Sequence, residues 1–90
     1  METNNVNQIE DILKSNEIIL LKFDKKNSKY NEYFNSLDFK IVNITDEEII
    51  SFYEIDTLPT ILIYKNNNLI DSIIGFNTKT ELIKKILQLI

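Results

Sequence analysis

The chain has 90 residues, of which 43% are hydrophobic, so we expect a single domain over residues 1–90 with a small core. It contains no Cys and no His, which excludes thiol catalysis, disulfides, thiolate metal sites and every nucleophile system that needs His. The net charge of −4, without blocks of like charge, disfavours nucleic acid or an anionic membrane as a partner. We expect no cofactor and no metal.

The N-terminal sequence METNNVNQIE lacks the basic start and apolar stretch of a signal peptide, and the longest apolar run, residues 18–21, is too short to span a bilayer. A cytoplasmic location is therefore expected. Ile, Asn and Lys are abundant, whereas Ala, Arg and Trp are absent. This skew indicates an AT-rich genome, so the counts of asparagine and lysine are weak evidence for function.

The first half of the chain predicts two helices and two strands. Apolar residues at helical spacing predict a helix over residues 5–15. The run IILLKF (18–23) is apolar on both faces of its pleat, as a central strand needs. Aromatic and leucine side chains at helical spacing predict a helix over 28–37, and FKIVNI (39–44) alternates as a strand.

A third helix, also short, is predicted after these strands, because Thr45 and Glu48 have the spacing of a capping box. Asp46, Glu47 and Glu48 resemble a metal-binding cluster, but acidic residues at a helix N-terminus are favoured by the helix dipole, which is the better account. The run TILIYK (60–65) is apolar on both faces and predicts another central strand.

The last segment predicts a hairpin and a final helix. The asparagines at 66–68 tolerate positive φ and predict a tight turn. LIDSII (69–74) includes polar residues and suits an edge strand, after which Gly75 would permit a bulge or a close backbone approach. Thr78 and Glu81 repeat the capping box ahead of an amphipathic helix.

The element order is α-β-α-β-α-β-β-α, which indicates an α/β fold. A strand–helix–strand unit calls for a parallel pair with a right-handed crossover, and the turn at 66–68 makes an antiparallel hairpin. We expect a mixed four-stranded sheet with helices on both faces. Its spatial order is 39–44, 18–23, 60–65, 69–74.

This layout, with the only proline of the chain directly before the third strand, resembles the thioredoxin fold. The segment LPTILIYKNNNLIDSIIGFNTKTELIKKI is similar to the C-terminal half of a thioredoxin, where an Ile-Pro-Thr strand start, a Lys-Asn-Gly-type hairpin, a Val-Gly pair and a final helix follow one another. Pro59 and Gly75 are 16 residues apart, the family's usual spacing. Upstream, IILLKF and VNITDEEIISFYEI match family segments, so the likeness covers about residues 17–90.

The resemblance implies that the peptide bond before Pro59 is cis. This conformation would leave the neighbouring backbone free to pair with an extended peptide, as thioredoxins do with their substrates. The alternative is that Pro59 merely begins a strand in trans, where its missing N–H does no harm.

The redox motif of the family is missing. Counting the family's spacing from Phe23 leads to Ser28-Lys29-Tyr30-Asn31, where thioredoxins have Cys-x-x-Cys. A serine hydroxyl has no redox couple and cannot replace a thiol. The chain therefore resembles a redox-inactive member of the superfamily, and we expect it not to be an enzyme of the disulfide oxidoreductase class.

Other family positions have changed as well. The family's buried Asp corresponds to Lys22, and its Lys partner corresponds roughly to Ile41. Because a buried ammonium is costly, we expect Lys22 to reach solvent or a carboxylate such as Asp24 or Asp56. The segment between the motif position and Pro59 is shorter than in typical thioredoxins, so the chain resembles a trimmed version of the fold.

The resemblance also implies a binding surface at one end of the sheet, with an apolar centre formed by Tyr30, Leu58 and Phe76. Alternatively, Tyr30 packs under its own helix and Phe76 against the final helix, which leaves an ordinary surface. The predicted protein-binding surface consists of Ser28, Lys29, Tyr30, Asn31, Thr57, Leu58, Pro59, Gly75 and Phe76.

The resulting hypothesis is a non-catalytic thioredoxin-like module that binds another protein, or an extended peptide segment, at the proline loop. An alternative is a structural or assembly subunit, or a homodimer, that uses the 69–74 edge or a helix face. A glutathione-binding, transferase-like enzyme is a third possibility, but the chain lacks the acidic-serine glutathione motif and a second helical domain.

Overall fold

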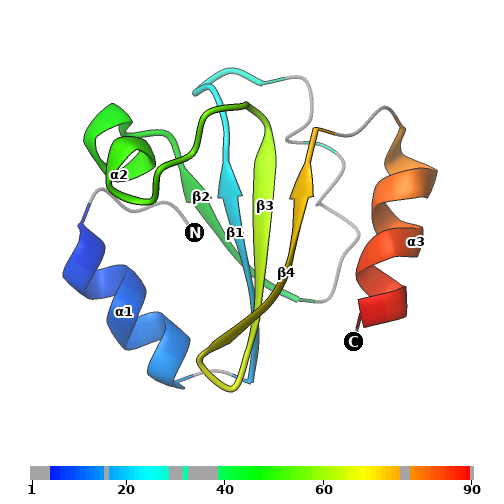
Figure 1. Ribbon diagram of the computed structural model, residues 1–90, viewed down its shortest axis with the longest axis horizontal. Helices are drawn as coiled ribbons and strands as arrows, with labels where there is room; N and C mark the ends of the chain where they lie inside the picture. The colour runs from blue at the N-terminus through cyan, green and yellow to red at the C-terminus, as the bar shows by residue number, and fades with distance from the viewer. Residues whose placement is uncertain (1–4, 16, 29–31, 33–38, 76–77, 90) are drawn as a thin grey trace.

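A four-stranded mixed sheet with helices on both faces makes up the computed structural model of the chain (Figure 1). The described residues are 5–15, 17–28, 32, 39–75 and 78–89. In chain order the elements are α1 (Val6–Ser15), β1 (Ile18–Phe23), β2 (Lys40–Ile44), α2 (Glu47–Phe52), β3 (Thr60–Lys65), β4 (Asn68–Ile74) and α3 (Lys79–Leu89). The strand order β2-β1-β3-β4 confirms the predicted sheet and fold class.

The pairing of the strands also follows the prediction. Strands β1 and β2 are parallel, and β3 is antiparallel to both β1 and β4. The hairpin between β3 and β4 turns at Asn66 and Asn67, whose φ angles are 52° and 67°. Asparagine tolerates such positive values, which the two-residue hairpin turn requires.

The bulge that the sequence suggested near Gly75 lies elsewhere. Ile63 pairs with Asp71 while Tyr64 pairs with Leu69, so Ile70 is the extra residue of β4. Gly75 instead follows the strand with a φ of 66°, and its N–H donates to the carbonyl oxygen of Pro59 at 2.8 Å. Neither role suggested for this glycine is seen, since a Cβ there would meet nothing within 4 Å, and its positive φ is what favours glycine.

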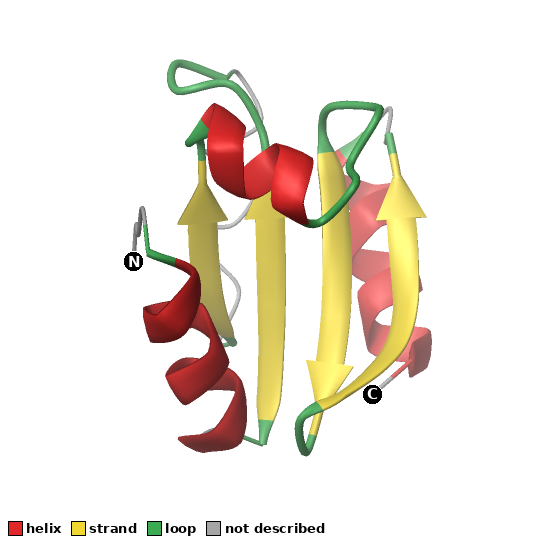
Figure 2. Ribbon diagram, turned by 60° about the vertical axis from the view of Figure 1, so that its left-hand side comes forward, coloured by secondary structure: helices red, strands yellow, loops and turns green. Residues whose placement is uncertain are grey.

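Two hydrophobic clusters hold the layers together. Helices α1 and α2 lie on one face of the sheet and α3 on the other, as Figure 2 shows. The first cluster comprises Ile9, Leu13, Ile19, Leu21, Phe23, Val42, Ile44, Ile49 and Leu62. The second comprises Leu20, Ile61, Ile63, Ile73, Leu82 and Ile86. Both central strands, β1 and β3, contribute to both clusters, as expected for strands that are apolar on both faces.

Several predicted boundaries need correction. The N-cap of α2 is Asp46 rather than Thr45, since its Oδ1 accepts the N–H groups of Glu48 at 2.9 Å and Ile49 at 3.2 Å. Strand β2 begins one residue later than predicted and β4 one residue earlier. The cap of α3 is as predicted, because Thr78 Oγ1 accepts the Glu81 N–H at 3.2 Å. The helix predicted over 28–37 lies outside the described residues, apart from its first residue and position 32.

Candidate functional site

The proline loop, residues 57–59, lies between α2 and β3 and is held by hydrogen bonds to nearby residues. The Leu58–Pro59 peptide bond is cis, and Pro59 is buried. The Thr60 hydroxyl donates to the Thr57 carbonyl oxygen, and the carbonyl oxygen of Pro59 accepts the N–H of Gly75, the residue after β4. These bonds order the loop at the end of the sheet where β3 begins and β4 ends.

Leu58 presents both a side chain and backbone groups at this loop. Its side chain is 38% exposed. Among the described residues, none forms a hydrogen bond with the N–H or the carbonyl oxygen of Leu58. A backbone donor and acceptor without a protein partner must be satisfied by water or by an incoming chain. Within the described part of the chain, both backbone groups of Leu58 are therefore left without a protein partner.

The structure brings only part of the predicted surface together. Thr57, Leu58 and Pro59 form the loop, and Gly75 is bonded to it. Ser28 is half-buried in the segment after β1. Four further predicted residues lie outside the described residues: Lys29, Tyr30, Asn31 and Phe76.

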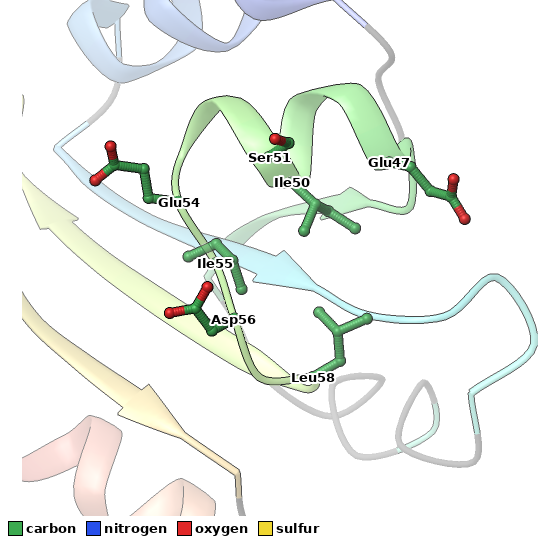
Figure 3. A pocket seen from close by; sticks show the side chains of 7 residues that line it. All are labelled: Glu47, Ile50, Ser51, Glu54, Ile55, Asp56 and Leu58. Atoms are coloured by element: carbon green, nitrogen blue, oxygen red, sulfur yellow. The ribbon is translucent and has the colours of Figure 1, made fainter.

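A hollow of about 650 Å³, which we call the helix hollow, opens beside Leu58. Its described lining comprises Glu47, Ile50, Ser51, Glu54, Ile55, Asp56 and Leu58. Figure 3 shows three apolar side chains in the middle of this hollow, with Glu47 on one side and Glu54 and Asp56 on the other.

Sequence reasoning missed the residues of α2 and its C-terminal end in this site. Glu47, Ile50 and Ser51 are spaced i, i+3 and i+4, which places them on one side of α2, whereas Glu54 follows the helix with a φ of 56°. That spacing was visible in the sequence. What it did not reveal is that this face of α2 turns toward the proline loop.

A second hollow of about 270 Å³, the sheet hollow, lies over β3 and β4. It shares Glu54, Ile55 and Asp56 with the helix hollow, so the two hollows adjoin along this segment. The rest of its lining comprises Thr57, Thr60, Leu62, Ser72 and Ile74.

A buried ion pair lies at the end of β1. The Lys22 ammonium is 3.7 Å from Asp24 Oδ2, and the two side chains are only 2% and 4% exposed. The prediction that Lys22 meets a carboxylate is confirmed for Asp24, while the option of reaching solvent was wrong. Asp24 Oδ1 also accepts the N–H of Lys25 at 2.7 Å.

Metal-binding clusters and membrane-spanning helices do not occur among the described residues. Within these parts of the chain, no group of acidic residues is arranged to hold a metal ion, and Asp46 is engaged as the cap of α2. None of the described helices combines the length and the apolar character needed to cross a bilayer.

Comparison with protein families decides the classification. The thioredoxin family model matches residues 19–88, which is most of the chain. The chain belongs to the thioredoxin family. Comparison of the sequence with curated proteins gave no match.

Solved thioredoxins share the fold at low sequence identity. Mitochondrial thioredoxin 3 from Saccharomyces cerevisiae, in its oxidized form, is 23% identical with a TM-score of 0.83, covering 99% of this chain and 94% of that one. A chain from a structure on the thiol resolving mechanism of a yeast mitochondrial 1-Cys peroxiredoxin is also 23% identical, with a TM-score of 0.84 over 99% and 94% of the two chains. Plasmodium falciparum thioredoxin is 17% identical with a TM-score of 0.82, over 97% and 96%.

Thioredoxins usually act as oxidoreductases, and this chain departs from them in one decisive respect. Thiol–disulfide exchange begins with attack by a thiolate, and this chain has no cysteine to supply one. Its composition is therefore consistent with a redox-inactive member of the thioredoxin family.

Proposed function

We propose that this chain is a non-catalytic protein-binding module that holds an extended segment of another protein at the loop around Pro59. The observation that carries the proposal is the state of Leu58, whose side chain is 38% exposed and whose backbone groups have no partner among the described residues.

The physical basis of binding is the addition of a strand-like segment to an exposed backbone. In this mode main-chain hydrogen bonds supply affinity, and pockets for alternate side chains supply specificity. The backbone of Leu58 offers one donor and one acceptor, and the helix hollow beside it offers an apolar pocket. Bonds from Thr60 and Gly75 already order the loop, so little conformational entropy is lost when a partner binds.

A second candidate function, a structural subunit or homodimer, is favoured by the edge strand. Leu69, Ile70 and Ile74 on β4 are 54%, 39% and 67% exposed. Apolar side chains that are exposed along an edge strand can form a surface that contacts another protein. This surface would not need the proline loop at all.

A matched pair of variants separates the two functions. Leu58→Asp changes the loop, whereas Leu69→Asp makes the same substitution at the other end of the β3–β4 hairpin, on a side chain that is more exposed. Each variant is first required to match the wild-type circular dichroism spectrum and urea midpoint. All three proteins are then immobilised and used in quantitative pull-downs from host lysate.

We expect Leu58→Asp to lose at least one partner that both wild type and Leu69→Asp retain. If Leu69→Asp loses the partner and Leu58→Asp keeps it, the edge strand is the binding surface and the proposal is wrong. If all three retain the same proteins, the proline loop has no binding role.

A further inference from the structure

The helix hollow has an apolar centre that continues from the proline loop. Ile50 and Ile55 are half-buried and lie beside Leu58 (Figure 3). The volume of about 650 Å³ falls in the range of ligand pockets, roughly 300–1,000 Å³. An apolar side chain of a segment bound at Leu58 would remove these three side chains from water.

The sides of the same hollow are acidic. Glu47, Glu54 and Asp56 are all exposed, and no described residue of the lining is a lysine. Within the described part of the chain, none of these three carboxylates takes part in an ion pair. The negative charge around the apolar centre is therefore not neutralised by a described side chain of the protein.

We infer that the partner segment at this loop is basic, with an apolar side chain seated between Ile50, Ile55 and Leu58 and flanking Lys or Arg side chains against the three carboxylates. The inference rests on the proposed function and adds the chemistry of the partner. Charges of complementary sign at the border of an interface mainly raise the association rate and select the right partner.

Charge also argues against a second copy of the chain in this hollow. A symmetric dimer buries the same surface on both subunits, so the carboxylates of both hollows would meet. Like charges brought together across an interface oppose association. A basic peptide avoids this repulsion.

Peptide selection tests the inference and does not require the natural partner. A phage-displayed library of short random peptides is selected on the wild-type chain, and clones that also bind Leu58→Asp are discarded. The remaining peptides are synthesised with a fluorescent label, and their affinities are measured by anisotropy at low and at physiological ionic strength. Self-association of the chain is measured in parallel by analytical ultracentrifugation.

Two triple variants with the same net charge serve as the site variant and its control. The site variant is Glu47→Gln, Glu54→Gln, Asp56→Asn. The control is Glu10→Gln, Glu17→Gln, Asp71→Asn, which changes exposed acids that do not line either hollow.

We expect the selected peptides to be enriched in Lys and Arg next to apolar residues. The site variant should weaken their binding by roughly 3- to 100-fold at low salt, because the fold-changes from losing three exposed ion pairs multiply. The effect should be smaller at physiological salt. The control variant should stay within about twofold of wild type, because its changes lie away from the peptide.

Four results would overturn the inference. Peptides that depend on Leu58 but are not basic, or that both triple variants weaken equally, would leave the proposed function standing with a different partner chemistry. Self-association that Leu58→Asp abolishes would make a second copy the occupant. The absence of any peptide that depends on Leu58 would overturn the proposed function as well.

Discussion

Replacing Asp24 with Asn is expected to destabilise the folded chain by about 3–5 kcal/mol, although the two side chains have nearly the same shape. Asn can still accept the Lys25 N–H that Asp24 Oδ1 accepts at 2.7 Å. What is lost is the negative charge 3.7 Å from the Lys22 ammonium, at a site where both side chains are at most 4% exposed. Breaking one half of a buried pair is costly because an ammonium is poorly solvated in the protein interior.

Urea denaturation of four proteins measures this effect. Lys22→Met removes the other charge and should destabilise by a similar amount, since Asp24 Oδ2 has no hydrogen-bond partner among the residues that the structure describes. The double variant Lys22→Met/Asp24→Asn removes both charges and should be close to wild type in stability, or above it. A folded domain of this length is stable by only about 5–13 kcal/mol, so either single variant could be largely unfolded, whereas the double variant stays measurable.

Two results would refute this account of the pair. Single variants that each lose less than about 1 kcal/mol would show that the site behaves like an exposed ion pair. A double variant as unstable as the sum of the two single variants would show that the charges do not interact.

Three further predictions concern stability. Gly75→Ala should lower the free energy of unfolding, measured by urea denaturation, by about 1–2 kcal/mol, because the φ of 66° is unfavourable for a residue with a Cβ even though that Cβ would meet nothing within 4 Å. Gly75→Asn should lower it by less. Asp46→Ala should cost about 1 kcal/mol by removing the cap of α2, while Asp46→Ser retains most of that stability, and equal losses would contradict the capping role. The pKa of Tyr53 is raised above 10.0, mainly by burial and then by the charges of Tyr64 and Glu10. Burial also raises the pKa of Tyr64. Above about pH 10 the unfolded chain therefore loses phenolic protons that the folded chain keeps, so stability should fall with rising pH, and urea midpoints should fall less steeply in Tyr53→Phe.

The sheet could be predicted because its signals are local and repeated. Strands β1 and β3 each supply apolar side chains to both clusters, and only central strands need that pattern. Asn66 and Asn67 supply the backbone that a two-residue turn requires. Together with the right-handed crossover, these local features are enough to predict the order of the strands.

The errors arose where neighbouring residues offered similar chemistry. Thr45 and Asp46 both carry an oxygen that can cap a helix, and a shift of one residue decides between them. Lys22 lies in a strand whose neighbours are apolar, yet the sequence does not tell whether its long side chain reaches water or a buried carboxylate.

The candidate site was only half predictable. The resemblance pointed to Pro59 and Leu58 because a single proline before a strand is a local pattern. Glu47 of α2, and Glu54 and Asp56 after it, belong to the site only because this segment lies beside Leu58 of the proline loop, which depends on tertiary contacts. The sequence predicts that Ile55 and Asp56 lie in a connecting loop, but both residues line the helix hollow and the sheet hollow.

The extra residue of β4 has a consequence for how the molecule behaves at high concentration. An edge strand with apolar side chains is a template on which further chains can add and grow into aggregates. At Ile70 the regular spacing of outward N–H and carbonyl groups is interrupted, and Asp71 follows at once with a charge. Since a bulge twists the edge and a charge opposes stacking, the longest regular run left for a foreign strand is short. The hairpin can therefore carry exposed Leu and Ile while resisting fibril growth from this edge.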